Sequence, residues 1–175
     1  MTNLESSQIR SFLEAVGKRY PYFARLYLLG GSALCLLGSP RPTLDIDYIG
    51  DDLKKSDLQN IMEETAREMG LDVDAVPIER FLPVPAGGYQ RSLPVGKFGK
   101  IEVYIFDPYS IALSKIDRGF DTDIDDVVFL LQRGLINMEE LERITQISIK
   151  RAHAFDMDPA EMSAHLQAVR ERMKR

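Results

Sequence analysis

The chain has 175 residues, of which 45% are hydrophobic and 28% are charged, and this composition suits a globular protein with one hydrophobic core. The net charge of −5 argues against a protein that coats nucleic acid, but it does not exclude binding of one nucleotide or one RNA end. The single cysteine excludes a disulfide framework, and the first residues lack the pattern of a signal peptide. No apolar run reaches the roughly 20 residues of a membrane helix. We therefore expect a cytoplasmic protein that does not enter a membrane.

Hydrophobic spacing predicts that helices and strands alternate in the first half of the chain. Ser56, followed by Gln59 three residues later, is typical of the capping box that starts a helix, and Gly70 is a suitable end for it. The expected elements are a helix over 5–18, a strand over 25–29, a short helix over 32–38, a strand over 44–49, a helix over 56–69 and a strand over 73–76. The proline- and glycine-rich segment 77–100 is expected to form loops and a hairpin.

The second half begins with a strand and continues with helices. Residues 100–106 alternate apolar and polar side chains, as a half-buried strand does. Helices are expected over 107–118, 121–133, 137–154 and from 158 to the end of the sequence. The predicted fold class is therefore α/β, or more specifically α+β: a small mixed sheet with packed helices and a helical C-terminal third. We expect one domain over 1–135 and a helical extension over 136–175 that packs on it.

Asp45 and Asp47 stand on one expected strand, separated by a single apolar residue. Alternate side chains of a strand point to the same face, with their Cα atoms about 6–7 Å apart. Two carboxylates in that arrangement can bind one Mg²⁺, which prefers oxygen ligands. The alternative is an edge strand with a solvated acidic face, and the pair alone does not decide between them.

Gly30, Gly31 and Ser32 lie between an expected strand and a short helix. Glycines allow a phosphate to approach the backbone, and the first amides of a helix favour its negative charge. The Ser32 hydroxyl offers one more hydrogen-bond donor. The spacing matches neither a P-loop nor a dinucleotide-binding fingerprint, and the two glycines taken alone favour the alternative, a tight strand–helix turn.

The glycine turn and the aspartate pair together resemble motifs of the DNA polymerase β-like nucleotidyltransferase superfamily. The match is closest to the minimal nucleotidyltransferases of the AbiEii toxin and DUF6036 kind, through Leu29-Gly30-Gly31-Ser32-Ala33-Leu34 and Arg41-x-Thr43-x-Asp45-Ile46-Asp47. The resemblance implies two Mg²⁺ or Mn²⁺ ions on the aspartates and a nucleoside triphosphate held by the glycine–serine turn, Arg41 and Thr43. It also implies transfer of a nucleoside monophosphate to an RNA end or a protein hydroxyl, and a cognate toxin or antitoxin as partner. The alternative is a nucleotide- or partner-binding module without turnover.

The superfamily resemblance also implies a third carboxylate, on a later strand between apolar neighbours. Glu102, between Ile101 and Val103, fits this pattern and is expected to bind metal and act in catalysis. An exposed glutamate on a half-buried strand is the alternative. Tyr104 and Asp107 are the neighbouring candidates.

A second matching block lies in the helical part of the chain. Lys115 and Arg118 are three residues apart, as are Asp123 and Asp126, so each pair shares a helix face. The resemblance implies that Lys115 neutralises triphosphate charge in catalysis and that the other three contribute to nucleotide binding. Ion pairs that join the two helices are the alternative. If the functional interpretation holds, Lys115 converges with Ser32, Asp45, Asp47 and Glu102 on one cleft.

Overall fold

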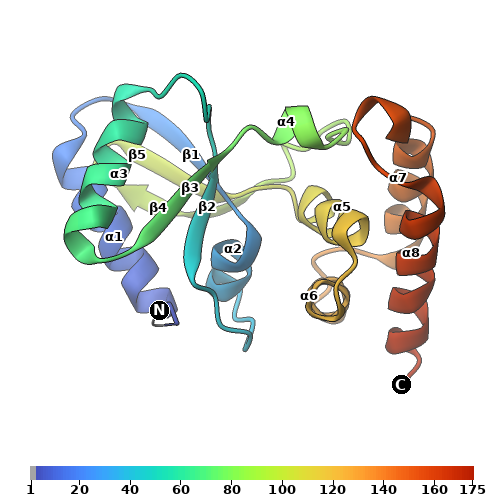
Figure 1. Ribbon diagram of the computed structural model, residues 1–175. Coiled ribbons are helices and arrows are strands. Elements are labelled where there is room, and N and C mark those ends of the chain that lie inside the picture. Colours follow the sequence, from blue (N-terminus) through green and yellow to red (C-terminus); the bar gives the residue numbers. More distant parts are fainter. Residues whose placement is uncertain (1–2) are drawn as a thin grey trace. The chain divides into compact units, whose positions relative to one another are not determined.

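The computed structural model (Figure 1) describes residues 3–175 and divides into two compact units. The first unit extends to Ile78 and resumes from Ser92 to Phe106. The second comprises Glu79–Arg91 and Asp107–Arg175. The domain boundary expected between residues 135 and 136 does not coincide with this division, since it falls inside the second unit.

The first unit is built on a five-stranded sheet with the strand order β3-β2-β1-β5-β4. The pairs β1–β5 and β2–β3 are parallel, whereas β1–β2 and β4–β5 are antiparallel. The strands are β1 (Ala24–Leu29), β2 (Asp45–Ile49), β3 (Asp72–Val76), β4 (Leu93–Phe98) and β5 (Ile101–Ile105). This mixed sheet with helices confirms the fold class predicted from the sequence.

One face of this sheet is buried and the other carries polar side chains. Alternation along β2 and β5 buries every second side chain, including Ile46, Tyr48 and Val103. The helices α1 (Ser6–Arg19) and α3 (Asp57–Met69) pack against each other and lie on the same side of the sheet (Figure 1). The opposite face is therefore where Asp45 and Asp47 project.

The second unit is helical. Its helices are α5 (Pro108–Arg118), α6 (Asp121–Gln132), α7 (Met138–Ile149) and α8 (Pro159–Met173), and α4 (Ile78–Phe81) stands at its first boundary. The core consists of apolar side chains from all four long helices, among them Leu113, Val127, Leu141 and Leu166. No helix among residues 3–175 is both long and apolar enough to cross a membrane.

The boundaries of two helices, α2 and α7, differ most from the sequence prediction. The short helix α2 (Gly30–Leu36) begins at Gly30 and not at Ser32, because Leu29 is its N-cap. The helix expected over 137–154 ends at Ile149, where the amide of Arg151 bonds the carbonyl of Ser148 only three residues back. Bonds of this tighter type end an α-helix, and a 3₁₀ turn over Ala152–Ala154 follows.

Candidate metal and nucleotide site

Three carboxylates meet on neighbouring strands of the first unit. Asp45 and Asp47 belong to β2, and Asp74 stands beside Asp47 on the parallel strand β3. One carboxylate oxygen of each lies within 4.8 Å of the others. Asp45 and Asp47 are partly buried and Asp74 is exposed. We call these three residues the aspartate cluster.

The turn at Gly30 lies directly against the aspartate cluster. Gly30 has a φ of 58°, a left-handed conformation that favours glycine. A Cβ atom at Gly30 would overlap the Oδ2 atom of Asp47, and one at Gly31 would overlap the hydroxyl of Thr43. Gly30 therefore allows the backbone to approach the Asp47 carboxylate, and Gly31 allows it to approach Thr43.

Thr43 positions the first aspartate. Its side chain is buried, and its hydroxyl donates a hydrogen bond of 3.2 Å to the carbonyl of Asp45. The carbonyl of Thr43 accepts a 2.8 Å hydrogen bond from the amide of Leu4. Thr43 is predicted to bind nucleotide, and its contacts within the protein fix the start of β2 against Gly31. Arg41, two residues earlier, is half-buried in the loop before β2, where its amide donates to the hydroxyl of Ser39 at 3.3 Å.

Ser32 is fully buried in the first turn of α2. Its hydroxyl donates a 3.0 Å hydrogen bond to the carbonyl of Leu29, three residues earlier. A serine hydroxyl has only one proton to donate. In this arrangement the hydroxyl proton is used inside the turn, and contact with a phosphate would require the hydroxyl to rotate away from Leu29.

Glu102 does not belong to the aspartate cluster. It stands beside Arg25, whereas Asp47 stands beside Leu29, four residues further along β1. Four strand residues span roughly 13 Å. The Glu102 carboxylate accepts hydrogen bonds from Arg25, at 3.3 Å, and from the hydroxyl of Tyr104, at 3.2 Å. Glu102 was expected to lie with Asp45 and Asp47, but its carboxylate contacts Arg25 and Tyr104.

Asp74 is the residue that the sequence analysis missed. Its neighbours, Val73 and Ala75, are both apolar, so the apolar–acid–apolar pattern sought around Glu102 also occurs on the strand expected over 73–76. Choosing between the two required the strand order, because β3 is adjacent to β2 whereas β5 is not.

The other alternative, Asp107, has a structural role in the second unit. It is fully buried at the N-cap of α5. Arg91 donates to both of its oxygens, at 2.9 and 2.6 Å, and the Tyr109 amide and Ser110 hydroxyl add two more hydrogen bonds. These contacts attach the segment 79–91 to α5.

Lys115 lies in a buried ion-pair network between α5 and α6. Its ammonium group is 3.2 Å from Asp123 and 2.9 Å from Asp126, and all three side chains are at most 5% exposed. Arg118 donates two hydrogen bonds to Asp123, at 2.7 and 2.6 Å. Burial raises the pKa of Asp123, but the hydrogen bonds from Arg118 and the charges of Lys115 and Arg118 outweigh it and hold this pKa below its ordinary value. The four residues therefore form ion pairs that join the two helices, and Lys115–Asp123 is one of the two pairs expected as the alternative to nucleotide binding.

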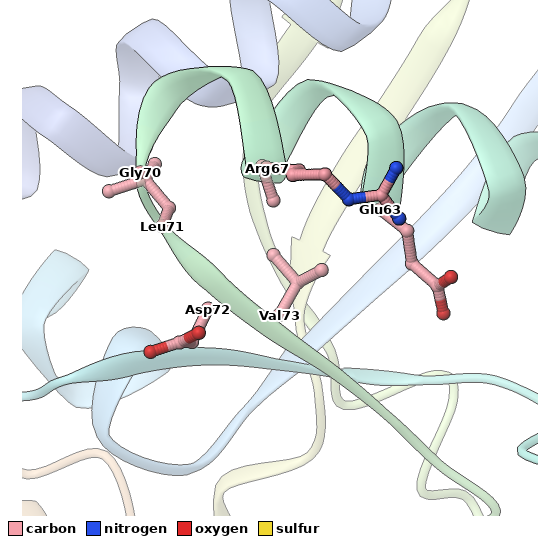
Figure 2. Close-up of a pocket in the computed structure, with 7 residues that line it drawn as sticks. Glu63, Arg67, Gly70, Leu71, Asp72 and Val73 are labelled. Atoms are coloured by element: carbon pink, nitrogen blue, oxygen red, sulfur yellow. The ribbon is translucent and has the colours of Figure 1, made fainter.

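A hollow of about 500 Å³ lies beside the aspartate cluster's outer strand, where α3 ends and β3 begins (Figure 2). Its lining includes Arg67, Gly70 and Val73 but none of the three clustered aspartates. Figure 2 shows Val73 directed toward α3 and Asp72 directed away from it, as alternation along a strand requires. The hollow thus opens on the helix-covered side of β3, and Asp74 shares the side of Asp72.

Comparison with known families assigns the chain. The family described as "Nucleotidyltransferase of unknown function (DUF6036)" matches residues 7–174, so the chain belongs to this family. Neither a curated protein nor a solved structure matches the chain.

Proposed function

We propose that this member of DUF6036 is a metal-dependent nucleotidyltransferase that moves a nucleoside monophosphate from a nucleoside triphosphate to an RNA end or a protein hydroxyl. The observation that carries the proposal is the aspartate cluster, with its oxygens within 4.8 Å of one another beside the turn at Gly30. The family description supports the reaction class.

The aspartate cluster fits a divalent cation. Its ligands are all carboxylate oxygens, which suit Mg²⁺ and Mn²⁺ better than softer metals. Asp45, Asp47 and Asp74 would hold the metal, and the resemblance to polymerase β-like enzymes implies two ions. When bound, such ions neutralise phosphate charge and make an acceptor hydroxyl a better nucleophile.

The protein's own contribution is to position the substrates. Gly30 and Gly31 let the backbone of this turn pack directly against the Asp47 carboxylate and the Thr43 hydroxyl, because a Cβ atom at either position would overlap those groups. Thr43 fixes the backbone of Asp45 through its buried hydroxyl. Because phosphoryl-type transfer requires little covalent chemistry from the protein, such positioning and charge stabilisation supply most of the catalysis.

The biological setting is also part of the proposal. The resemblance to AbiEii-type proteins favours a role in a toxin–antitoxin or defence module, with the cognate toxin or antitoxin as binding partner. Co-expression with the product of a neighbouring gene tests this role. Rescue of growth or co-purification supports it, and the absence of both for each neighbour contradicts it.

The central experiment measures metal binding and transfer together. Mn²⁺ binding is followed by electron paramagnetic resonance, and transfer by incubation with each labelled triphosphate, Mg²⁺ or Mn²⁺, and cellular RNA or lysate. Asp47→Asn and Asp74→Asn are expected to weaken Mn²⁺ binding and abolish transfer. Asp72→Asn, an exposed aspartate on the same strand and face, is the matched control.

Glu102→Gln separates the two candidates for the third carboxylate. If Asp74 is the ligand, Glu102→Gln retains Mn²⁺ affinity while Asp74→Asn loses it. The opposite pattern would show that the strands around the metal are not arranged in the order β3-β2-β1-β5-β4. Wild-type protein that binds neither Mn²⁺ nor any triphosphate would refute the proposed function.

A binding module without turnover is the second candidate. It is favoured by the internal hydrogen bond of Ser32 and the buried ion pairs of Lys115, because both side chains were expected to contact the triphosphate. Binding of Mn²⁺ and nucleotide without transfer to any RNA or protein would establish this candidate in place of the enzyme.

A further inference from the structure

The polar face of the sheet continues beyond the aspartate cluster as a row of aromatic and basic side chains. Alternation along β1 places Arg25 and Tyr27 on the same face as Leu29, which stands beside Asp47. Their partners on β5 are Glu102 and Tyr104. Residues directly opposite each other on neighbouring strands share a face. The aspartate cluster and this row therefore lie on one surface of the first unit.

Two tyrosines form the centre of the row. The rings of Tyr27 and Tyr104 are stacked, with centroids 5.4 Å apart and an angle of 23° between their planes. Both side chains are half-buried. Phe106 packs edge-on against Tyr27, at a centroid distance of 6.1 Å, and holds this ring in place. The hydroxyl of Tyr104 is fixed by its hydrogen bond to Glu102. The two rings are thus held rigidly next to the aspartate cluster.

Positive charge lies beyond the tyrosines. The side chain of Arg25 is 58% exposed, and its guanidinium lies 5.7 Å from the ring centre of the exposed Phe23. Lys97 on β4 stands opposite Glu102 and is exposed. Arg25 and Lys97 therefore flank Glu102 and supply more positive than negative charge at this end of the row. We call Arg25, Tyr27, Lys97 and Tyr104 the tyrosine face.

The spacing along the strands matches a polynucleotide. Leu29 stands beside Asp47. Along β1, Tyr27 is two residues from Leu29 and Arg25 is four residues from it, which correspond to distances of about 7 Å and about 13 Å. Each step is comparable to the length of one nucleotide in an extended strand. A terminal hydroxyl at the aspartate cluster would then place a base near the tyrosines and a phosphate near Arg25 and Lys97.

We propose that the tyrosine face binds the end of a single-stranded RNA acceptor, with a base stacked on Tyr27 and Tyr104 and a backbone phosphate at Arg25 and Lys97. Bases of a single strand are free to stack on aromatic rings, whereas bases within a duplex are not. The proposal rests on the proposed function, because it names the acceptor for the same site. The net charge of −5 agrees with recognition of one end and not of a long strand.

The test measures binding in EDTA and without nucleotide, so that neither metal nor triphosphate contributes. The probes are a fluorescein-labelled single-stranded RNA of eight nucleotides and a blunt duplex of the same sequence. Wild-type protein is expected to prefer the single strand. Tyr104→Ala is expected to weaken its binding about 10-fold, within the range found when one stacking ring is removed. Tyr104→Phe keeps the ring and is expected to retain binding.

Two further variants complete the experiment. Tyr22→Ala is the matched control, because Tyr22 is an exposed tyrosine of the same unit just before β1, and it is expected to change nothing. Lys97→Gln leaves the tyrosines intact and is expected to weaken RNA binding. It should also reduce the slope of log binding constant against log salt concentration by about one, as expected for the loss of one phosphate contact. It keeps the proposal testable if Tyr104→Ala fails to fold.

The outcomes separate this proposal from the proposed function. Equal binding of duplex and single strand, no detectable binding of either, or equal effects of Tyr22→Ala and Tyr104→Ala would overturn the tyrosine face as an RNA site. Binding of an acidic peptide in competition with the RNA would identify a protein acceptor instead. Mn²⁺ binding that depends on Asp47 would leave the proposed function standing in each of these cases. Single-strand binding by a protein that binds neither Mn²⁺ nor any triphosphate would refute the proposed function and leave the tyrosine face as an RNA-binding surface only.

Discussion

Replacing Lys115 by methionine distinguishes a structural role of the lysine from a role in nucleotide binding. The change preserves the length of the side chain and removes its charge. Lys115 contacts both Asp123 and Asp126, whose side chains are at most 2% exposed. If the network is structural, the variant leaves two buried carboxylates without their shared cation, and the second unit loses stability.

The size of the effect follows from burial. Removing one partner of a buried ion pair typically costs about 3–5 kcal/mol, because the remaining charge is left uncompensated. Arg118 still donates two hydrogen bonds to Asp123, which places the expectation near the lower limit, at about 3 kcal/mol. Lys150→Met, at an exposed lysine following α7, is the control and should change stability by less than about 0.5 kcal/mol.

Urea unfolding followed by circular dichroism at helix wavelengths measures this loss, since the second unit is predominantly helical. The chain has two compact units, so two transitions are possible, and the one that carries most of the helix signal is compared between variants. A stability change below about 1 kcal/mol for Lys115→Met, combined with loss of triphosphate binding, would refute the structural role and restore Lys115 as a nucleotide ligand.

Three other substitutions test the geometry around the sheet and the network. Gly30→Ala should lower Mn²⁺ affinity and reduce the free energy of unfolding by more than about 1 kcal/mol, because the added methyl group overlaps Asp47. Gly70→Ala is the control, since Gly70 also has a positive φ but no atom lies within 4 Å of the added Cβ, and it should leave Mn²⁺ binding intact. Equal Mn²⁺ affinities of the two variants would contradict the close approach of Gly30 to Asp47. The pKa of Asp123 is lower in the folded protein than in the unfolded chain. The stability that its carboxylate contributes is therefore complete above the unfolded pKa of about 3.9 and is lost as the pH falls through the folded pKa. Asp123→Asn should reduce this loss of stability at acid pH, as measured by urea unfolding at a series of pH values. The buried Tyr48 hydroxyl makes no hydrogen bond of ordinary geometry among residues 3–175, although Gln59 lies close enough to act on its pKa. Tyr48→Phe should therefore keep or raise the melting temperature, and a clear decrease would identify Gln59 as a hydrogen-bond partner.

Local signals in the sequence were sufficient to predict most of the helices and strands. The hydroxyl of Ser56 accepts a 3.3 Å hydrogen bond from the amide of Gln59, and Gly70 adopts the left-handed conformation that ends α3. Asp107 and Pro108 start α5 in the same way. Each of these signals acts over three or four residues, so the chain need not be folded to recognise it.

The pairing of strands was not accessible in this way. Glu102 has the expected apolar neighbours, but β5 is separated from β2 by β1, and Glu102 stands opposite Arg25. Asp74 has similar neighbours on β3, which is adjacent to β2. Strand order depends on contacts between segments far apart in sequence, and one residue pattern is compatible with several orders.

Burial decides which polar residues remain available to a ligand. Ser32 and Lys115 were expected to face the triphosphate, but both are at most 5% exposed and bonded within the protein. A buried polar group needs such partners, because leaving it unpaired costs free energy. In the aspartate cluster, three carboxyl groups lie within 4.8 Å of one another on adjacent strands, and like charges at this distance repel one another. A divalent cation would remove that repulsion, and this is the physical reason for placing the metal at Asp45, Asp47 and Asp74.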